Sequence, residues 1–299
     1  MPIKKYAGID IGSNAARLII KDLLPSEGTE YVLKSRVYIR LPIRLGTDVF
    51  LKGKILKKKK EEFLKAMQIF KDIIDYNNVD KYRICATSAV RNAKNKDAVI
   101  QSVKKKIGLK IQIIDGHEEA RLLYLTNREK LEKEQYYISA DLGGGSLQIG
   151  LFKYTELIWA HAYKAGTLRF VTKTVDPKEI ISLEKKLNEL KTDYPDAKLT
   201  GSGGNINKIS KLVGKSILNY EDLQKLYSEI IRLSYEDRIK KYAFREDRAD
   251  VILPALKIYM RLLKATEKNS IFVPKTGLAD GIIYSLFLKD YKLNKLKHK

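Results

Sequence analysis

The chain has 299 residues, of which 44% are hydrophobic and 31% are charged, with a formal net charge of +22 and one cysteine. This length predicts two domains, and a single cysteine excludes an internal disulfide. No run approaches the roughly 20 apolar residues of a membrane span, and the N-terminus lacks a signal-peptide core, so we expect a cytoplasmic protein. The charge favours a polyanionic partner, nucleic acid or a phosphate polymer, although lysine-rich helices are often only solvated faces.

The first half of the chain predicts three strands and then alternating helices and strands. The expected elements are strands at 5–11, 16–22 and 31–41, a loop at 44–48, a helix at 55–77, a strand at 82–86, a helix from Ser88, a strand at 110–114 and, after Gly116, a helix that begins near His117. The helix at 55–77 has one apolar stripe, formed by Phe63, Met67, Phe70 and Ile74. Cys85 lies in an apolar strand and reads as a structural residue.

The second half repeats this order. The expected elements are strands at 136–141, 146–153 and 156–163, helices at 166–173 and 177–191, a strand at 198–201, a helix to about 213, helices at 221–231 and 235–241, a long helix at 246–268, a strand at 271–273 and a helix at 277–289. We therefore expect an N-terminal domain at 1–122 and a C-terminal domain at 123–299, with the last helix able to join the first domain.

Two glycine-containing hairpins constrain function most. They are Asp10-Ile11-Gly12-Ser13-Asn14 and, about one domain's length further along, Asp141-Leu142-Gly143-Gly144-Gly145-Ser146. In each hairpin a carboxylate ends a strand, a turn with little or no side chain follows, and the strand pattern resumes. Glycine admits positive φ and close approach of a ligand, and successive bare N–H groups can cradle an anion. The sequence thus predicts two phosphate-binding hairpins, each with an aspartate placed for a divalent cation.

Six further motifs lie between and after the two hairpins. They are Arg44-Leu45-Gly46, Ala86-Thr-Ser-Ala-Val-Arg91, Asp115-Gly116-His-Glu-Glu-Ala-Arg121, Gly201-Ser-Gly-Gly-Asn205, Arg248-Ala-Asp-Val-Ile-Leu-Pro254 and Gly277-Leu-Ala-Asp-Gly281. With these motifs, nearly the whole chain resembles the exopolyphosphatase/guanosine pentaphosphate phosphohydrolase (Ppx/GppA) family in its short two-domain form. The expected fold class is α/β, with two ribonuclease H-like domains around a central cleft, the architecture of actin-like ATPases, sugar kinases and heat-shock chaperones.

The resemblance also implies roles for individual residues. It implies catalysis by Glu119, which would activate the attacking water, and by Arg91, which would grip phosphate. It implies a metal site formed by Asp10, Asp141 and Gln148. The implied substrate-binding residues are Ser13, Asn14, Gly143, Gly144, Gly145, Ser146, Gly203, Gly204 and Asn205.

Two positions depart from the family's pattern. Gln148 stands where the family usually has a glutamate, and Ala279 stands where an arginine is frequent. A glutamine amide oxygen can touch a metal or a water but brings no charge, so this departure bears on metal binding and rate. Ala279 removes one potential phosphate ligand.

Structural explanations compete with several of these roles. Without its motif, Arg91 would read as a surface helix residue, and Glu118 and Glu119 as acids that complement a helix dipole. Arg248 could pair with Asp250 or Glu246. His117 stands beside the acid pair, but a single histidine without a partner in sequence is more often a polar helix-start residue than a metal ligand.

The resemblance implies an exopolyphosphatase that hydrolyses terminal phosphate from inorganic polyphosphate with Mg²⁺ or Mn²⁺. Guanosine pentaphosphate is the second expected substrate, and a polyphosphate- or nucleotide-binding regulatory protein with weak catalysis is the third reading, because of Gln148. A sugar or acetate kinase is disfavoured, since no separate adenosine-binding stretch is found. We expect no membrane partner and no specific nucleic-acid partner. The sequence leaves a homodimer open.

Overall fold

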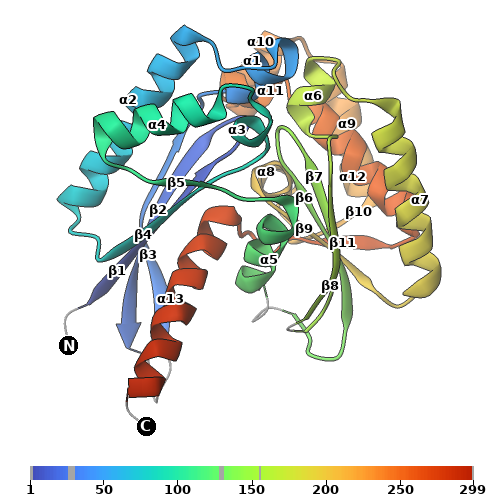
Figure 1. The fold of residues 1–299 in the computed structure, drawn as a ribbon. Helices are drawn as coiled ribbons and strands as arrows, with labels where there is room; N and C mark the ends of the chain where they lie inside the picture. The colour runs from blue at the N-terminus through green and yellow to red at the C-terminus, as the bar shows by residue number, and fades with distance from the viewer. Residues whose placement is uncertain (1–2, 26–30, 128–130, 155, 298–299) are drawn as a thin grey trace. The chain divides into compact units, whose positions relative to one another are not determined.

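The computed structural model describes residues 3–25, 31–127, 131–154 and 156–297. The chain divides into two compact units, one formed by Met1–Thr126 with Leu278–Lys299 and the other by Asn127–Gly277. Both units combine a sheet with helices (Figure 1). The last helix, α13 (Leu278–Lys297), thus belongs with the N-terminal part of the chain.

The first unit is built on a five-stranded sheet in the order β3-β2-β1-β4-β5. Its strands are β1 (Lys4–Ile11), β2 (Ala16–Pro25), β3 (Tyr31–Leu41), β4 (Lys81–Ala86) and β5 (Ile111–Ile113). The first three are antiparallel neighbours, whereas β1, β4 and β5 run parallel. The helices of this unit are α1 (Leu45–Lys52), α2 (Lys57–Tyr76), α3 (Ser88–Asn92), α4 (Lys96–Ile107), α5 (Gly116–Asn127) and α13.

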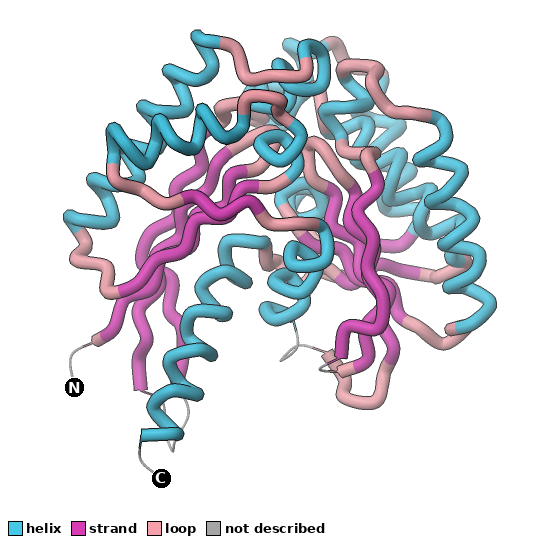
Figure 2. Tube along the Cα trace, viewed as in Figure 1, coloured by secondary structure: helices cyan, strands magenta, loops and turns pink. Residues whose placement is uncertain are grey.

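Strand β1 is buried on both faces, which explains its nearly continuous apolar sequence. Ala7, Ile9 and Ile11 share a core with α2 and α4, whereas Tyr6 packs with Ala279 and Ile283 of α13. The predicted stripe of α2 is buried in the first of these cores. Figures 1 and 2 show α2 and α4 on one face of this sheet and α13 on the other.

The second unit has a six-stranded sheet in the order β10-β11-β9-β6-β7-β8. Its strands are β6 (Tyr136–Leu142), β7 (Leu147–Lys153), β8 (Glu156–Tyr163), β9 (Lys198–Ser202), β10 (Ile217–Asn219) and β11 (Ser270–Phe272). Its helices are α6 (Thr167–Val171), α7 (Pro177–Asp193), α8 (Gly204–Val213), α9 (Tyr220–Ile231), α10 (Tyr235–Tyr242), α11 (Glu246–Ala249) and α12 (Ile252–Thr266). The antiparallel β8-β7-β6 hairpins followed by parallel β9 and β11 reproduce the strand order of the first unit.

The repeated strand order confirms the predicted α/β class with two ribonuclease H-like, actin-like folds. Some local expectations were wrong. The expected loop at 44–48 begins α1, and the expected long helix at 246–268 is two helices, α11 and α12. The interruption places Pro254 in the first turn of α12, where its missing N–H costs no helical hydrogen bond. In the described part of the chain, no helix combines the length and apolar character that crossing a membrane requires.

Candidate active site

The three-glycine turn between β6 and β7 is held from one side by α6. The backbone N–H of Thr167 donates to the carbonyl of Gly143 (3.0 Å), and that of Leu168 donates to Gly144 (2.8 Å). The third glycine carbonyl, that of Gly145, accepts a hydrogen bond from Nε of Arg169 (2.8 Å). All three glycine carbonyls therefore point toward α6.

This arrangement determines where the N–H groups of the turn point. In a trans peptide, the N–H of each residue is directed opposite to the preceding carbonyl. The N–H groups of Gly144, Gly145 and Ser146 therefore face away from α6, as an anion cradle requires. The approach of α6 depends on Gly166, because a Cβ built there would overlap the backbone of Gly144 and Gly145.

A carboxylate and a buried amide lie beside this turn. Asp141 of β6 and Gln148 of β7 are directly opposite each other in the antiparallel register, which brings their side chains close on one face. Gln148 is 3% exposed, and both its Nε2 and Oε1 are buried without a hydrogen-bond partner. An unsatisfied buried polar atom costs about 1–3 kcal/mol, so this amide is a candidate to contact a bound group.

The loop from β9 into α8 approaches the same carboxylate. Gly203 has a positive φ of 87°, and a Cβ there would overlap Oδ1 of Asp141. Gly203 is therefore the position of this loop that requires glycine, whereas Gly143 of the three-glycine turn does not have a positive φ. Gly204 begins α8, whose N-terminal N–H groups favour an anion.

Asn205 links this loop to the end of β6. Its Nδ2 donates to the carbonyl of Leu142 (2.6 Å), and its Oδ1 accepts from Nη1 of Arg248 (2.5 Å). Both ends of the buried Asn205 amide are thus engaged within the chain. Arg248 is thus tied to Asn205, and its pairing with Asp250 or Glu246, which the sequence suggested, stays a prediction.

Three residues near the turn were not singled out from the sequence: Gly166, Arg169 and Tyr259. For Gly166 and Arg169, the sequence offered only the expected helix at 166–173 directly after the strand at 156–163, with nothing that placed this helix beside the turn.

Tyr259 lies near the Asp141 carboxylate. Burial, and secondarily this carboxylate, raise the pKa of Tyr259 well above its usual value. The phenol of this fully buried residue on α12 therefore stays protonated. No feature of the sequence pointed to Tyr259, because α12 lies far along the chain from Asp141.

The hairpin of the first unit carries side chains and an internal ion pair. Oδ2 of Asp10 accepts from Nη1 of Arg17 at 2.6 Å, and the two residues are register partners. Burial raises the pKa of Asp10, and the guanidinium of Arg17 partly offsets this rise. Ser13 is buried with its hydroxyl 2.9 Å from that of Ser88, and its carbonyl accepts from the N–H of Gly46. The carbonyl of Asn14, also buried, accepts from the N–H of Arg44.

The first unit also brings together the two residues predicted to be catalytic. Arg91, in the last turn of α3, places Nη1 3.6 Å from Oε2 of Glu119, in the first turn of α5. The same Nη1 donates to the carbonyl of Ile114 (2.5 Å), which fixes the guanidinium. Glu119 is 6% exposed, so its carboxylate lies in a largely water-excluded setting.

The neighbouring acid, Glu118, is engaged differently. It accepts hydrogen bonds from Arg83 and Arg121. Burial alone would raise its pKa, but these two hydrogen bonds outweigh burial and hold the pKa of Glu118 below its ordinary value. Glu118 is thus a charged member of an ion-pair cluster at neutral pH, whereas the predicted role of Glu119 as the base stays a prediction.

The predicted metal residues fit a divalent cation unequally. Among the described residues, no group of three or more histidine, cysteine, aspartate or glutamate side chains is arranged as a metal site. Asp141 and the buried amide of Gln148 offer two neighbouring oxygens, and Mg²⁺ commonly takes one or two protein ligands together with substrate phosphates and water. Asp10 fits less well, because one of its oxygens is engaged by Arg17. All three assignments stay predictions.

Comparison with known proteins places the chain among phosphatases. The model of the Ppx/GppA phosphatase family matches residues 37–290. Exopolyphosphatase 1 of Mycobacterium tuberculosis H37Rv is 24% identical over 300 residues, covering 92% of this chain and 86% of the relative. The corresponding protein of Mycobacterium leprae is 23% identical over 299 residues, covering 92% and 87%.

Solved structures give the same result. The crystal structure of the Aquifex aeolicus member of the Ppx/GppA family has a TM-score of 0.77 and 27% identity, covering 97% of this chain and 99% of the other. A likeness in fold extends to an exopolyphosphatase of Cytophaga hutchinsonii, with a TM-score of 0.82, 21% identity and coverage of 95% and 97%. The family model spans most of the sequence, and the chain belongs to the Ppx/GppA phosphatase family.

Proposed function

We propose that this protein is an exopolyphosphatase that releases orthophosphate from the end of inorganic polyphosphate. The observation that carries the proposal is the glycine turn whose three carbonyls are held by α6, so that its N–H groups face outward beside Asp141 and Gln148. Such a turn suits a terminal phosphoryl group. Family membership and the names of the curated relatives support the same substrate class.

The proposed reaction is an in-line displacement by water. Glu119 accepts a proton from the water, the oxygen of that water forms the new bond to phosphorus, and the bond to the bridging oxygen breaks. The shortened chain leaves as a phosphate anion, and the proton on Glu119 passes to solvent. Arg91 orients the Glu119 carboxylate, and the outward N–H groups of the turn stabilise negative charge on the transferred group.

A divalent cation, Mg²⁺ or Mn²⁺, would neutralise charge on the phosphate oxygens, with Asp141 and Gln148 as its protein ligands. Asp10, predicted to assist, has one carboxylate oxygen engaged by Arg17. The other predicted binding residues, Ser13, Asn14, Gly203, Gly204 and Asn205, stay predictions. Because the hydroxyl of Ser13 is hydrogen-bonded to Ser88, we expect it to contribute little to phosphate affinity.

A second candidate function follows from Gln148. Its buried amide has no charge, and a protein with this residue could bind polyphosphate or a nucleotide without turning it over. The test is phosphate release by the purified protein from long-chain polyphosphate, tetraphosphate and guanosine pentaphosphate, with and without Mg²⁺. Release from polyphosphate supports the proposal. Release only from guanosine pentaphosphate contradicts it, and binding without release selects the second candidate.

The base is tested with adjacent matched variants. We expect Glu119→Gln to lower kcat by about 10²–10⁴-fold, the usual worth of a general base, while polyphosphate affinity is kept. Glu118→Gln is the control, because it removes a charge one position away but disturbs only the cluster with Arg83 and Arg121. Equal losses of kcat in the two variants would contradict the assignment of Glu119.

A further inference from the structure

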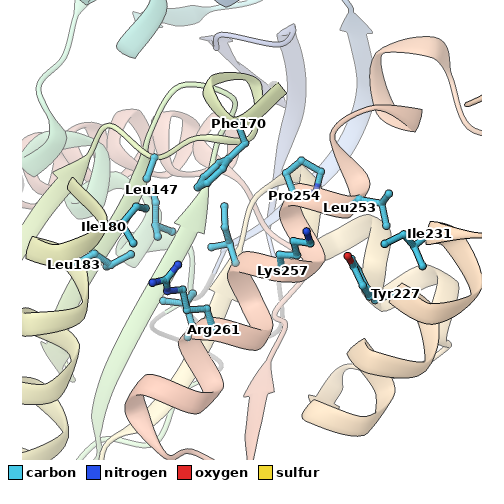
Figure 3. A pocket seen from close by; sticks show the side chains of 13 residues that line it. Leu147, Phe170, Ile180, Leu183, Tyr227, Ile231, Leu253, Pro254, Lys257 and Arg261 are labelled. Atoms are coloured by element: carbon cyan, nitrogen blue, oxygen red, sulfur yellow. The ribbon is translucent and has the colours of Figure 1, made fainter. Parts of the chain in front are cut away.

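A pocket lies within the second unit between α6, α7, α9 and α12 (Figure 3). Its volume is about 360 Å³, within the range of small-molecule sites. The lining is mostly apolar and includes Leu147, Phe170, Ile180, Leu183 and Leu253. Leu147 and Leu183 also belong to the hydrophobic core of the unit, so the inner part of the pocket is apolar.

The charge at the pocket comes from α12. Lys257 and Arg261 project from successive turns of this helix (Figure 3). Arg261 is neutralised by Glu184, with Nε to Oε1 at 2.7 Å. The ammonium of Lys257 lies over the ring of Tyr227, 5.6 Å from its centroid, and forms no ion pair in the described part of the chain. One uncompensated positive charge thus stands at the edge of an apolar pocket.

We propose that this pocket binds a small amphipathic monoanion, a carboxylate on an apolar chain of about ten carbons. The volume corresponds to roughly a dozen water molecules at liquid density, which sets the size of the ligand. The apolar floor would take the chain, and the exposed ammonium of Lys257 would meet the head group at the solvent edge. A polyphosphate chain does not fit the same chemistry, because leucine and isoleucine side chains offer no donors to its oxygens.

The pocket adjoins the glycine turn, since Leu147 follows Ser146, but no residue of the turn lines it. Helix α6 contacts both. Phe170 of α6 lines the pocket, while Thr167 and Leu168 at the other end of α6 hold the turn. The proposed site is therefore distinct from the phosphate site, and its test is independent of phosphate release.

The test is isothermal titration of the purified full chain with decanoate, below the concentration at which decanoate self-associates. We expect saturable binding of one decanoate per chain. Decyltrimethylammonium, which has the same chain and the opposite charge, should bind more weakly. Absence of saturable decanoate binding, or equal binding of both probes, would overturn the proposal.

Two variant pairs locate the site. Ile180→Trp fills the pocket and should abolish binding, whereas Ile181→Trp makes the same change at the next residue of α7, which is 65% exposed and does not line the pocket. Lys257→Gln should weaken decanoate binding by roughly twofold to fivefold, the worth of an exposed charge pair. Lys264→Gln is its control, because Lys264 lies two turns further along α12, over the ring of Tyr220.

If Ile180→Trp fails to fold, the lysine pair decides. Equal decanoate affinity of Lys257→Gln and Lys264→Gln would then refute the assignment of the charge. Binding that survives in correctly folded Ile180→Trp would refute the location of the site.

Discussion

The glycine hairpins of the two units share one backbone plan and differ in the residue that faces the aspartate. In the first unit Asp10 is the register partner of Arg17, and the two form an ion pair. In the second unit Asp141 has Gln148 as its register partner, an amide whose two polar atoms are buried without hydrogen bonds. The carboxylate of the first hairpin is paired within the chain, whereas the amide of the second has two polar atoms without a hydrogen-bond partner.

The backbone of both turns is held in the same way. The segment after β3 donates from Gly46 and Arg44 to the carbonyls of the first turn, as α6 does in the second. The first turn presents the side chains of Ser13 and Asn14, whereas the second presents three glycines. The same scaffold thus carries a turn with side chains in one unit and a turn of three glycines, the proposed anion cradle, in the other, and each difference can be tested.

Among changes to the two hairpins and their supports, the largest expected effect comes from Gly166→Ala. The added Cβ would push the backbone of Gly144 and Gly145 away from α6 and redirect the N–H groups of the turn. Loss of one such donor typically costs about 10²–10³-fold in kcat, so we expect a fall of that size in phosphate release. The control is Gly214→Ala, which adds backbone strain at positive φ but has open space around its Cβ. Similar activity in the two variants would contradict the role of α6.

Arg17→Gln makes the first hairpin resemble the second, and we expect it to lower the free energy of unfolding by about 2 kcal/mol at pH 7. The carboxylate of Asp10 is buried, and Arg17 is partly exposed, so the loss is smaller than for a fully buried pair. The measurement is urea unfolding, with Asp10→Asn combined with Arg17→Gln as the variant that removes both charges.

The pH dependence of this variant has a defined sign. Burial raises the native pKa of Asp10, and the loss of Arg17 would raise it further. The native state then binds a proton more tightly than the unfolded state, so stability falls as pH rises from the ordinary aspartate range through the raised pKa. The deficit of Arg17→Gln should therefore be larger at pH 7 than at pH 4.5. A deficit independent of pH would contradict this account.

Gln148→Glu changes the second hairpin in the opposite direction, by adding a negative charge opposite Asp141. We expect the Mg²⁺ concentration for half-maximal phosphate release to fall by on the order of tenfold, since a carboxylate attracts the cation more strongly than an amide. Without Mg²⁺ the variant should melt at a lower temperature than the parent, because two carboxylates repel. An unchanged Mg²⁺ requirement would show that Gln148 does not face the metal.

The sequence was sufficient to predict the parts of the fold that depend on local patterns. Apolar strands on either side of the two aspartate–glycine turns predicted both hairpins, and the stripe of α2 is buried as expected. The hydrogen bonds from α6 to the glycine turn were not predicted, because they join residues far apart in sequence, such as Arg169 and Gly145, which are 24 positions apart. Tyr259 was missed for the same reason, since only packing brings α12 to Asp141. Long-range contacts of this kind leave no periodic signal in the chain.

The smallest expected effects come from the two serines of the turns, and they should be opposite in kind. Ser13 is 3% exposed and its hydroxyl is hydrogen-bonded to Ser88, so Ser13→Ala should lower the free energy of unfolding by about 1 kcal/mol with little change in phosphate affinity. Ser146 ends the open turn, and Ser146→Ala should weaken phosphate binding severalfold while leaving stability nearly unchanged. Urea unfolding and titration with phosphate, applied to both variants, measure the two effects. If both alanines affect stability alone, the second turn is as self-contained as the first, and the distinction between the hairpins rests on the residue that faces each aspartate.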